Sequence, residues 1–211
     1  VKEMYYNNYL KALQNFDNIA EIELRETLQE FYDKGRSRDQ AWRTCKGTLY
    51  EYAVFRYIQS IIETNMLLNS KFTVKMGDEA LDGYKEQIVI YNWSEILPDV
   101  DIVVINKETD QVEAVFSCKT SLRERLTETA FWKRELEKKE NNIKLIFVTT
   151  DKDNELRIET NRYILLHVMD CTFVTDPGKY EELIKIFRAR HGWRKDFDEL
   201  TSKVRPIEEL E

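Results

Sequence analysis

Two short stretches carry acidic and basic side chains at a spacing suited to phosphodiester chemistry. The first is Pro98-Asp99, and the second is Ser117-Cys118-Lys119. Proline has no N–H to donate, so Pro98 favours a strand start or edge and places Asp99 where a strand begins. Ser117 and Lys119 are two apart and therefore point to one face of the next strand, where a hairpin brings Lys119 near Asp99. A carboxylate that holds a divalent cation, beside a lysine that positions water or neutralises phosphate charge, is suited to hydrolysis of a phosphodiester.

The alternative is an ordinary surface ion pair between a strand-end Asp99 and a solvated Lys119, which would contribute little. A lysine that directly follows a strand as apolar as 114–116 is less usual. This context favours a functional lysine.

The elements that must position these residues follow from the apolar periodicity. Residues 2–32 have helical spacing, residues 33–39 are a polar break, and Asp39 is expected to cap a helix that runs to about Met66. Residues 162–169 fit either a helix or a strand, and the stretch 193–211 is amphipathic and acidic. The remaining predicted elements are strands at 72–76, 87–91, 100–105, 112–118, 143–149 and 172–175, and helices at 126–140 and from Pro177 to about Arg190.

This order predicts an α/β fold, with a mixed sheet flanked by helices on both faces. The helix between the strands at 112 and 143 implies that those two strands are parallel. No seam divides the chain, so we expect one domain of ordinary size over 1–211. It would comprise a helical region at about 1–66, a core at about 46–176 and a helical region at about 177–211.

The composition is that of a globular protein, with 42% hydrophobic and 34% charged residues. No apolar run approaches the roughly 20 residues that span a bilayer, and the polar and aromatic start does not predict a signal peptide. Three widely spaced cysteines do not indicate disulfides or a zinc site, so we expect a cytoplasmic protein with no membrane partner. The net charge of −7 argues against a nucleic-acid partner, but basic residues cluster at 119–125, 133–139 and 188–195 and could contact phosphates.

The spacing of Pro98-Asp99 and Ser117-Cys118-Lys119 resembles the catalytic motif of the PD-(D/E)xK nucleases, with Ser117 in place of the usual acid. That replacement is similar to type II restriction endonucleases that cut CCGG, and to relatives that recognise CCNGG or CCWGG. The resemblance covers roughly residues 46–140 and, less clearly, 143–149. It implies a restriction-endonuclease-like core, Mg²⁺ as cofactor, double-stranded DNA as substrate, and a homodimer for a palindromic site.

Three charged residues, Arg123, Glu124 and Arg125, follow the lysine at the spacing that the CCNGG-type enzymes use to recognise G·C pairs. Their chemistry fits this role, because arginine can donate two hydrogen bonds to guanine and glutamate can accept one from cytosine. The alternative is a charged first helical turn in which the helix dipole favours Glu124.

The resemblance also implies how a metal would be held, by Asp99 and the main-chain carbonyl of Cys118. In that group the acid missing from the lysine strand comes from the following helix, at a spacing that falls here on Trp132. Glu128 and Glu135 share a helix face with Trp132, and either is a candidate for the displaced acid. For each of them alone, a solvated helix face is the simpler interpretation.

Upstream, Lys46-Gly47 and Glu51 resemble a Lys-Gly-x-x-x-Glu stretch on the helix before the sheet in many of these nucleases. Apolar neighbours indicate that Glu51 faces inward, where a carboxylate needs a partner or a metal. A glutamate on the helix surface is the equal alternative.

The sequence thus predicts a Mg²⁺-dependent, sequence-specific endodeoxyribonuclease, with Asp99, Lys119 and Glu51 as catalytic residues. Two alternatives remain open. One is another PD-(D/E)xK nuclease, for repair or for a particular DNA structure, and the other is a DNA-binding domain without activity. Incubation with plasmid DNA and Mg²⁺ would separate the three by discrete bands, smears, or binding without cleavage.

Overall fold

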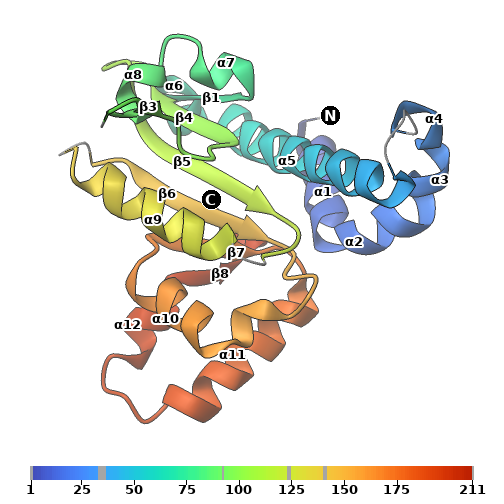
Figure 1. The fold of residues 1–211 in the computed structure, drawn as a ribbon, viewed down its shortest axis with the longest axis vertical. Helices are drawn as coiled ribbons and strands as arrows, with labels where there is room; N and C mark the ends of the chain where they lie inside the picture. The colour runs from blue at the N-terminus through green and yellow to red at the C-terminus, as the bar shows by residue number, and fades with distance from the viewer. Residues whose placement is uncertain (1, 33–36, 92, 123–124, 140–141, 211) are drawn as a thin grey trace.

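A six-stranded mixed sheet forms the centre of the computed structural model, which describes residues 2–32, 37–91, 93–122, 125–139 and 142–210. The strand order is β1-β4-β5-β6-β7-β8. Helices cover both faces, with α5 on one side and α9 on the other (Figure 1). The predicted α/β fold with a mixed sheet is confirmed. The strands are β1 (Phe72–Met76), β4 (Ile102–Asn106), β5 (Gln111–Lys119), β6 (Lys144–Thr149), β7 (Cys171–Val174) and β8 (Val204–Pro206).

The sheet changes direction at β5, the strand that ends at Lys119. β1, β4 and β5 are antiparallel neighbours, whereas β5 to β8 run parallel, and Lys119 pairs with Thr149 on β6. The parallel β5–β6 pair confirms the prediction made from the intervening helix α9 (Arg125–Glu137). In the β4–β5 turn, Asp110 takes a left-handed conformation at φ 55°, which Asp tolerates better than most side chains.

The strand predicted at 87–91 is wrong, the strand predicted at 100–105 begins two residues later, and β3 and β8 were not predicted. Residues 87–91 contain the end of α8 (Lys85–Ile88), and only β2 (Ile90–Tyr91) pairs there, with β3 (Glu95–Ile96). The first strand of the β4–β5 hairpin begins at Ile102, so Asp99 lies in the loop before it and not where the strand begins. β8 lies in the stretch 193–211, where three residues are too few for an alternating pattern to be recognised.

The N-terminal third is helical, as predicted. It contains α1 (Lys2–Gln14), α2 (Phe16–Ile19), a π-helical turn η1 (Ala20–Leu24), α3 (Arg25–Thr27), α4 (Gln29–Tyr32) and the long helix α5 (Arg38–Thr64). The expected cap of α5 is wrong, because the Ser37 hydroxyl accepts from the Gln40 N–H at 3.3 Å and Asp39 lies inside the first turn. Over the part of the chain that is described, no helix combines the length and apolarity needed to cross a membrane.

The remaining helices lie between α5 and the C-terminal end of the described chain. They are α6 (Met66–Lys71), α7 (Asp78–Leu81), η2 (Glu155–Arg157), α10 (Glu159–His167), α11 (Pro177–His191), α12 (Phe197–Thr201) and η3 (Ile207–Glu209). The ambiguous stretch 162–169 is therefore mostly helical, and Asp176 caps α11 by accepting from the Lys179 N–H at 3.1 Å. Gly83 has φ 85° in the predicted turn near Asp82, a conformation that glycine adopts without strain.

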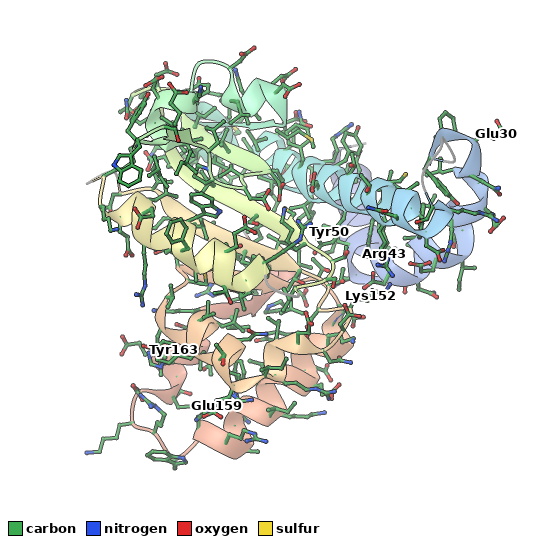
Figure 2. The ribbon with its side chains drawn as sticks, viewed as in Figure 1. Glu30, Arg43, Tyr50, Lys152, Glu159 and Tyr163 are labelled. Atoms are coloured by element: carbon green, nitrogen blue, oxygen red, sulfur yellow. The ribbon has the colours of Figure 1, made fainter. Side chains whose placement is uncertain are left out.

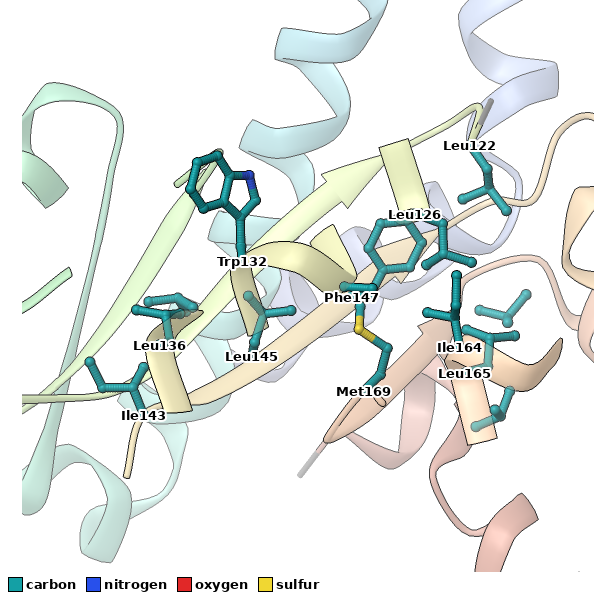
Figure 3. Close-up of a cluster of buried hydrophobic side chains, with 14 of the residues drawn as sticks. Leu122, Leu126, Trp132, Leu136, Ile143, Leu145, Phe147, Ile164, Leu165 and Met169 are labelled. Carbon is teal, nitrogen blue, oxygen red and sulfur yellow. The ribbon is translucent and has the colours of Figure 1, made fainter. Parts of the chain in front are cut away.

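Alternation along the strands divides the core into two layers. Phe116 and Cys118 face the α5 side together with Val148, whereas Val115 and Phe147 face the opposite side. On the α5 side these residues pack against buried α5 side chains such as Tyr50 and Val54. Figure 3 shows part of the opposite layer, in which α9 and α10 cover the sheet, with labelled residues that include Leu126, Trp132, Leu136, Phe147 and Ile164.

A buried lysine ties the N-terminal helices to α5. The Lys46 side chain is 4% exposed, and its Nζ lies 2.6 Å from Asp17 Oδ1 and 3.2 Å from Glu21 Oε1. Glu21 also accepts from Trp42 Nε1 at 3.3 Å and from Arg25 Nη1 at 3.2 Å. Lys46 is the lysine of the Lys-Gly-x-x-x-Glu stretch, five residues before Glu51. These contacts give it a structural role.

Removal of this lysine should loosen the N-terminal helices. We predict that Lys46→Met lowers the free energy of unfolding by about 1–3 kcal/mol, because Asp17 and Glu21 lose the charge they share in a half-buried place. Urea denaturation measures the change. Lys185→Met on the exposed face of α11 is the matched control, and equal stability of the two variants would contradict the role of Lys46.

Candidate active site

The site is built around one buried ammonium group. Lys119 ends β5, its side chain is 7% exposed, and its Nζ lies 3.0 Å from Asp99 Oδ2 and 2.9 Å from Asp101 Oδ2. The pairing of Asp99 with Lys119 that the hairpin predicted is present. The second carboxylate, Asp101, was not among the predicted site residues.

Asp101 is held by the hairpin itself. Its N–H donates to the Phe116 carbonyl at 2.9 Å, and its Oδ2 accepts from the Cys118 N–H at 2.6 Å. The side chain therefore lies across the end of β5. Asp101 could have been found from the sequence, because it directly precedes the apolar run of β4. A residue in that position lies at the edge of the sheet, whereas Asp99 is two residues further from the strand.

Burial sets the electrostatics of the pair. It raises the pKa of Asp101, even though Lys119 and the Cys118 N–H favour the carboxylate. Burial alone would lower the pKa of Lys119, but Asp101 and Asp99 more than offset it, and the pKa of Lys119 is raised. Lys119 is therefore a persistent cation between two carboxylates, and Asp99, at 38% exposure, is the partner that reaches solvent.

Glu51 approaches this group from α5. The pKa of Glu51 is raised to about 7, chiefly by burial; the charge of Asp101 adds to the rise and Lys119 opposes it. The structure thus brings the predicted Glu51 within electrostatic reach of Asp99, Asp101 and Lys119. Its helix faces inward there, because Tyr50 is fully buried and its hydroxyl lies 3.3 Å from Thr175 Oγ1 at the end of β7.

The predicted DNA-recognition residues are described only in part. Arg123 and Glu124 lie outside the described residues. Arg125 begins α9, its side chain is 55% exposed, and its Nη1 lies 3.9 Å from Asp99 Oδ2. Arg125 therefore borders the site and remains open to solvent.

Among the described residues, no ion pair joins the α9 acids Glu128 and Glu135 to this group. Within the described ranges, Glu128 is exposed and has no ion pair, and Glu135 pairs with Lys138. Trp132, at the position that the family spacing indicated, is packed into the core. Burial raises the pKa of the Cys118 thiol well above its usual range, so Cys118 can offer a cation only its main chain.

The chain was compared with known proteins. The model of a family described as BsaWI restriction endonuclease type 2 matches residues 80–198, more than half of the chain. The chain belongs to this family. The matched residues include Asp99, Asp101, Lys119 and Arg125, whereas Glu51 lies before them.

Two relatives named as type II restriction enzymes agree with this assignment. The type II restriction enzyme MjaVIP of Methanocaldococcus jannaschii is 28% identical over 72% of this chain and 76% of its own. The type II restriction enzyme HpyAORF263P of Helicobacter pylori is 29% identical over 63% of this chain and 76% of its own. The solved pre-specific BsaWI–DNA complex aligns with 98% of this chain and 77% of that chain, at 13% identity and a TM-score of 0.49, which is too loose to bear on the site. The protein is a type II restriction endonuclease.

The donor groups of this endonuclease site suit a hard divalent cation. Asp99 and Asp101 offer carboxylate oxygens, the ligands that Mg²⁺ prefers. Among the described residues, no three metal-ligating side chains come close enough to form a complete cage. Mg²⁺ commonly binds one or two carboxylates together with water and phosphate, so two aspartates at one sheet edge fit it better than a cation that requires a full protein cage.

The pKa of Glu51 predicts a pH dependence of stability. A carboxyl whose folded pKa, about 7, exceeds its ordinary value of 4.5 stabilises the fold while protonated, and this contribution is lost as pH rises from about 4.5 to 7. In EDTA, Glu51→Gln should therefore match the wild-type stability near pH 4.5 and exceed it above pH 7. Urea denaturation across this range measures the difference. Glu128→Gln, in an exposed place, should track the wild type, and a Glu51→Gln difference that does not change with pH would contradict the inward placement of Glu51.

Proposed function

We propose that this endonuclease is a Mg²⁺-dependent, sequence-specific homodimer of the PD-(D/E)xK type that hydrolyses phosphodiester bonds in double-stranded DNA, with residues 1–211 as one nuclease domain. The observation that carries the proposal is the Lys119 ammonium held 3.0 Å from Asp99 and 2.9 Å from Asp101 at the edge of the sheet. Because it acts on DNA, we place its activity in the cytoplasm.

Asp99 and Asp101 would hold the cation, together with the Cys118 main-chain carbonyl that the family resemblance implies. When bound, Mg²⁺ polarises the scissile phosphate and lowers the pKa of its water. Asp101 is fixed by the Cys118 N–H, and Asp99 is more exposed, so Asp101 supplies the rigid ligand and Asp99 the one that meets substrate.

Lys119 would change partners when DNA and a cation arrive. With Asp99 and Asp101 engaged as metal ligands, the Lys119 ammonium would be free to donate to a phosphate oxygen or to orient the attacking water. Lysine suits this exchange, since its compact charge sits on a flexible stem.

Glu51 is the third acid that the electrostatics favours. With a pKa of about 7 it can hold or release a proton near neutral pH, the range in which a general base works best. Glu128 and Glu135, the predicted alternatives, stay candidates of lower rank because neither shares the electrostatics of Asp101.

Recognition of G·C pairs rests on Arg123, Glu124 and Arg125. A residue six positions after a lysine at the scissile phosphate can reach base edges in the adjacent major groove, and arginine pairs with guanine there. Two subunits related by two-fold symmetry would each cut one strand of a palindromic site.

The catalytic assignment predicts the effect of conservative variants. Asp99→Asn, Asp101→Asn and Lys119→Met should each lower the cleavage rate by at least about 100-fold, because each removes a charge aimed at the reacting phosphate. Cleavage of plasmid DNA into discrete bands, with Mg²⁺ and with EDTA, is the measurement. EDTA should abolish cleavage by the wild type.

Three further variants rank the candidate acids. Glu51→Gln should lose cleavage activity, whereas Glu128→Gln and Glu135→Gln, the matched helix controls, should keep it. Retained DNA binding by Lys119→Met shows that its defect is chemical. Near wild-type cleavage by Asp99→Asn and Asp101→Asn together would overturn the site.

The recognition hypothesis predicts adjacent G·C pairs at the cut, as in CCGG or CCNGG-like sequences. In EDTA, Arg125→Ala should weaken binding to the cognate duplex by about 1–3 kcal/mol and leave non-specific binding nearly unchanged. Selection from a random duplex library identifies the site. If Arg125 only contacts phosphate, all sequences will weaken alike and the salt dependence will fall. A site made only of A·T pairs would overturn the G·C assignment and leave the nuclease assignment intact.

A further inference from the structure

A pocket of 160 Å³ lies between α10, α11 and α12. These elements form the lower part of the molecule in Figure 1, and Figure 2 labels Glu159 and Tyr163 on α10. The active site uses α5, the β4–β5 hairpin and the start of α9, so the pocket is built from separate elements. The pocket has no part in the proposed cleavage reaction.

Two arginines and two histidines line the pocket. Arg162, His167, His191 and Arg194 face one carboxylate in the described lining, Glu159. The sequence has two histidines, and both lie here. Arg194 is already matched, because its Nε and Nη2 donate to Asp196 at 2.8 and 2.7 Å. The charge left to be compensated is therefore that of Arg162 and its neighbours.

Arg162 is a buried cation without a counter-ion. The residue is 5% exposed, its Nη1 donates to the Arg157 carbonyl, and its Nε has no hydrogen-bond partner among the described residues. Within the described chain no carboxylate oxygen lies within 4.0 Å of its guanidinium, although Glu159 is near enough to act on its charge. Burial lowers the pKa of Arg162, and Arg190 lowers it further. An unpaired buried charge is costly, so the fold leaves a place for an anion here.

Helix capping does not explain this arginine. Arg190 and His191 end α11, where cations complement the helix dipole, but Arg162 stands near the N-terminal end of α10, where a positive charge is disfavoured. The His191 imidazole makes no hydrogen bond among the described residues, and burial and then Arg162 lower its pKa. The pocket therefore holds a buried guanidinium that no helix end accounts for, beside an imidazole whose N–H can donate to an anion.

The other wall of the pocket is apolar. Leu166, Phe197 and Leu200 line it, and the Tyr163 ring lies 4.8 Å from the His167 ring. A dry cavity of about 150 Å³ holds one benzene molecule, so the space admits one ring and excludes a whole nucleotide. Guanidinium groups bind carboxylate and phosphate through paired, charge-assisted hydrogen bonds.

We propose that this pocket binds a small organic oxyanion, a carboxylate or phosphate carried on one ring-sized apolar group. The oxyanion is held by Arg162 and His191, and the ring packs against Phe197 and Leu166. Because the proposal uses no active-site residue, it stands or falls independently of the cleavage reaction.

Phenyl phosphate is the probe, and the two histidines report its binding. In protein labelled with ¹³C-histidine, side-chain NMR shows two sets of signals, both from the pocket. Phenyl phosphate should shift them saturably at constant pH, whereas benzylamine, of the same ring and opposite charge, should not. Absence of a saturable shift, or equal binding of benzylamine, would overturn the proposal.

Variants assign the anion to Arg162. Arg162→Gln should weaken binding of phenyl phosphate at least about tenfold, the cost of one charge-assisted contact. Arg188→Gln, on the exposed face of α11, is the matched control and should bind as the wild type does. If Arg162→Gln does not fold, His191→Gln replaces it with the same expectation. Unchanged affinity in the folded variant, or equal weakening by Arg188→Gln, would contradict the assignment.

Discussion

The attraction between the Lys119 ammonium and two aspartates fixes the geometry on which the endonuclease site depends. Lys119 and Asp101 can remain charged in a buried place because the ammonium lies within 3.0 Å of both carboxylates and because a main-chain N–H also binds Asp101. The β4–β5 ladder supplies that N–H, since the same hairpin that pairs Asp101 with Phe116 also aims the Cys118 N–H at its carboxylate. The chemistry of the site is therefore a consequence of strand register.

Strand register also explains which parts of the site could be predicted. Lys119 and Asp99 could be placed from period-two alternation and the proline, because both rules act within a few residues. Asp101 was not predicted, because Pro98 indicates only the residue beside it. The hydrogen bond that holds Asp101 joins neighbouring strands, and no local sequence pattern predicts it. The acid expected on α9 was sought by family spacing, and that position is filled by Trp132, which the core requires.

The fold was predictable where the pattern of apolar residues extends over a whole strand or over several helical turns. The strands at β1, β5 and β6 and the long helix α5 carry strong apolar periodicity, and they were predicted to within about two residues. Short elements escaped, because β8 has three residues and the 87–91 stretch divides between a helix turn and a two-residue strand. The failed cap of α5 has the same cause. Ser37 and Asp39 are both good caps, and only the local backbone decides between them.

The stretch Lys46-Gly47 to Glu51 couples the two halves of the molecule in one helix. Its lysine turns toward Asp17 and Glu21 on the N-terminal helices, and its glutamate turns toward Asp101 and Lys119 at the sheet edge. The surface of α5 that meets the N-terminal helices thus fixes the rotation of the helix, and that rotation sets how far Glu51 reaches. The pKa of Glu51 depends on its position, because burial and the nearby charge of Asp101 both raise it. The N-terminal helices lie outside the family match at 80–198, yet through Lys46 they contact the helix that carries Glu51.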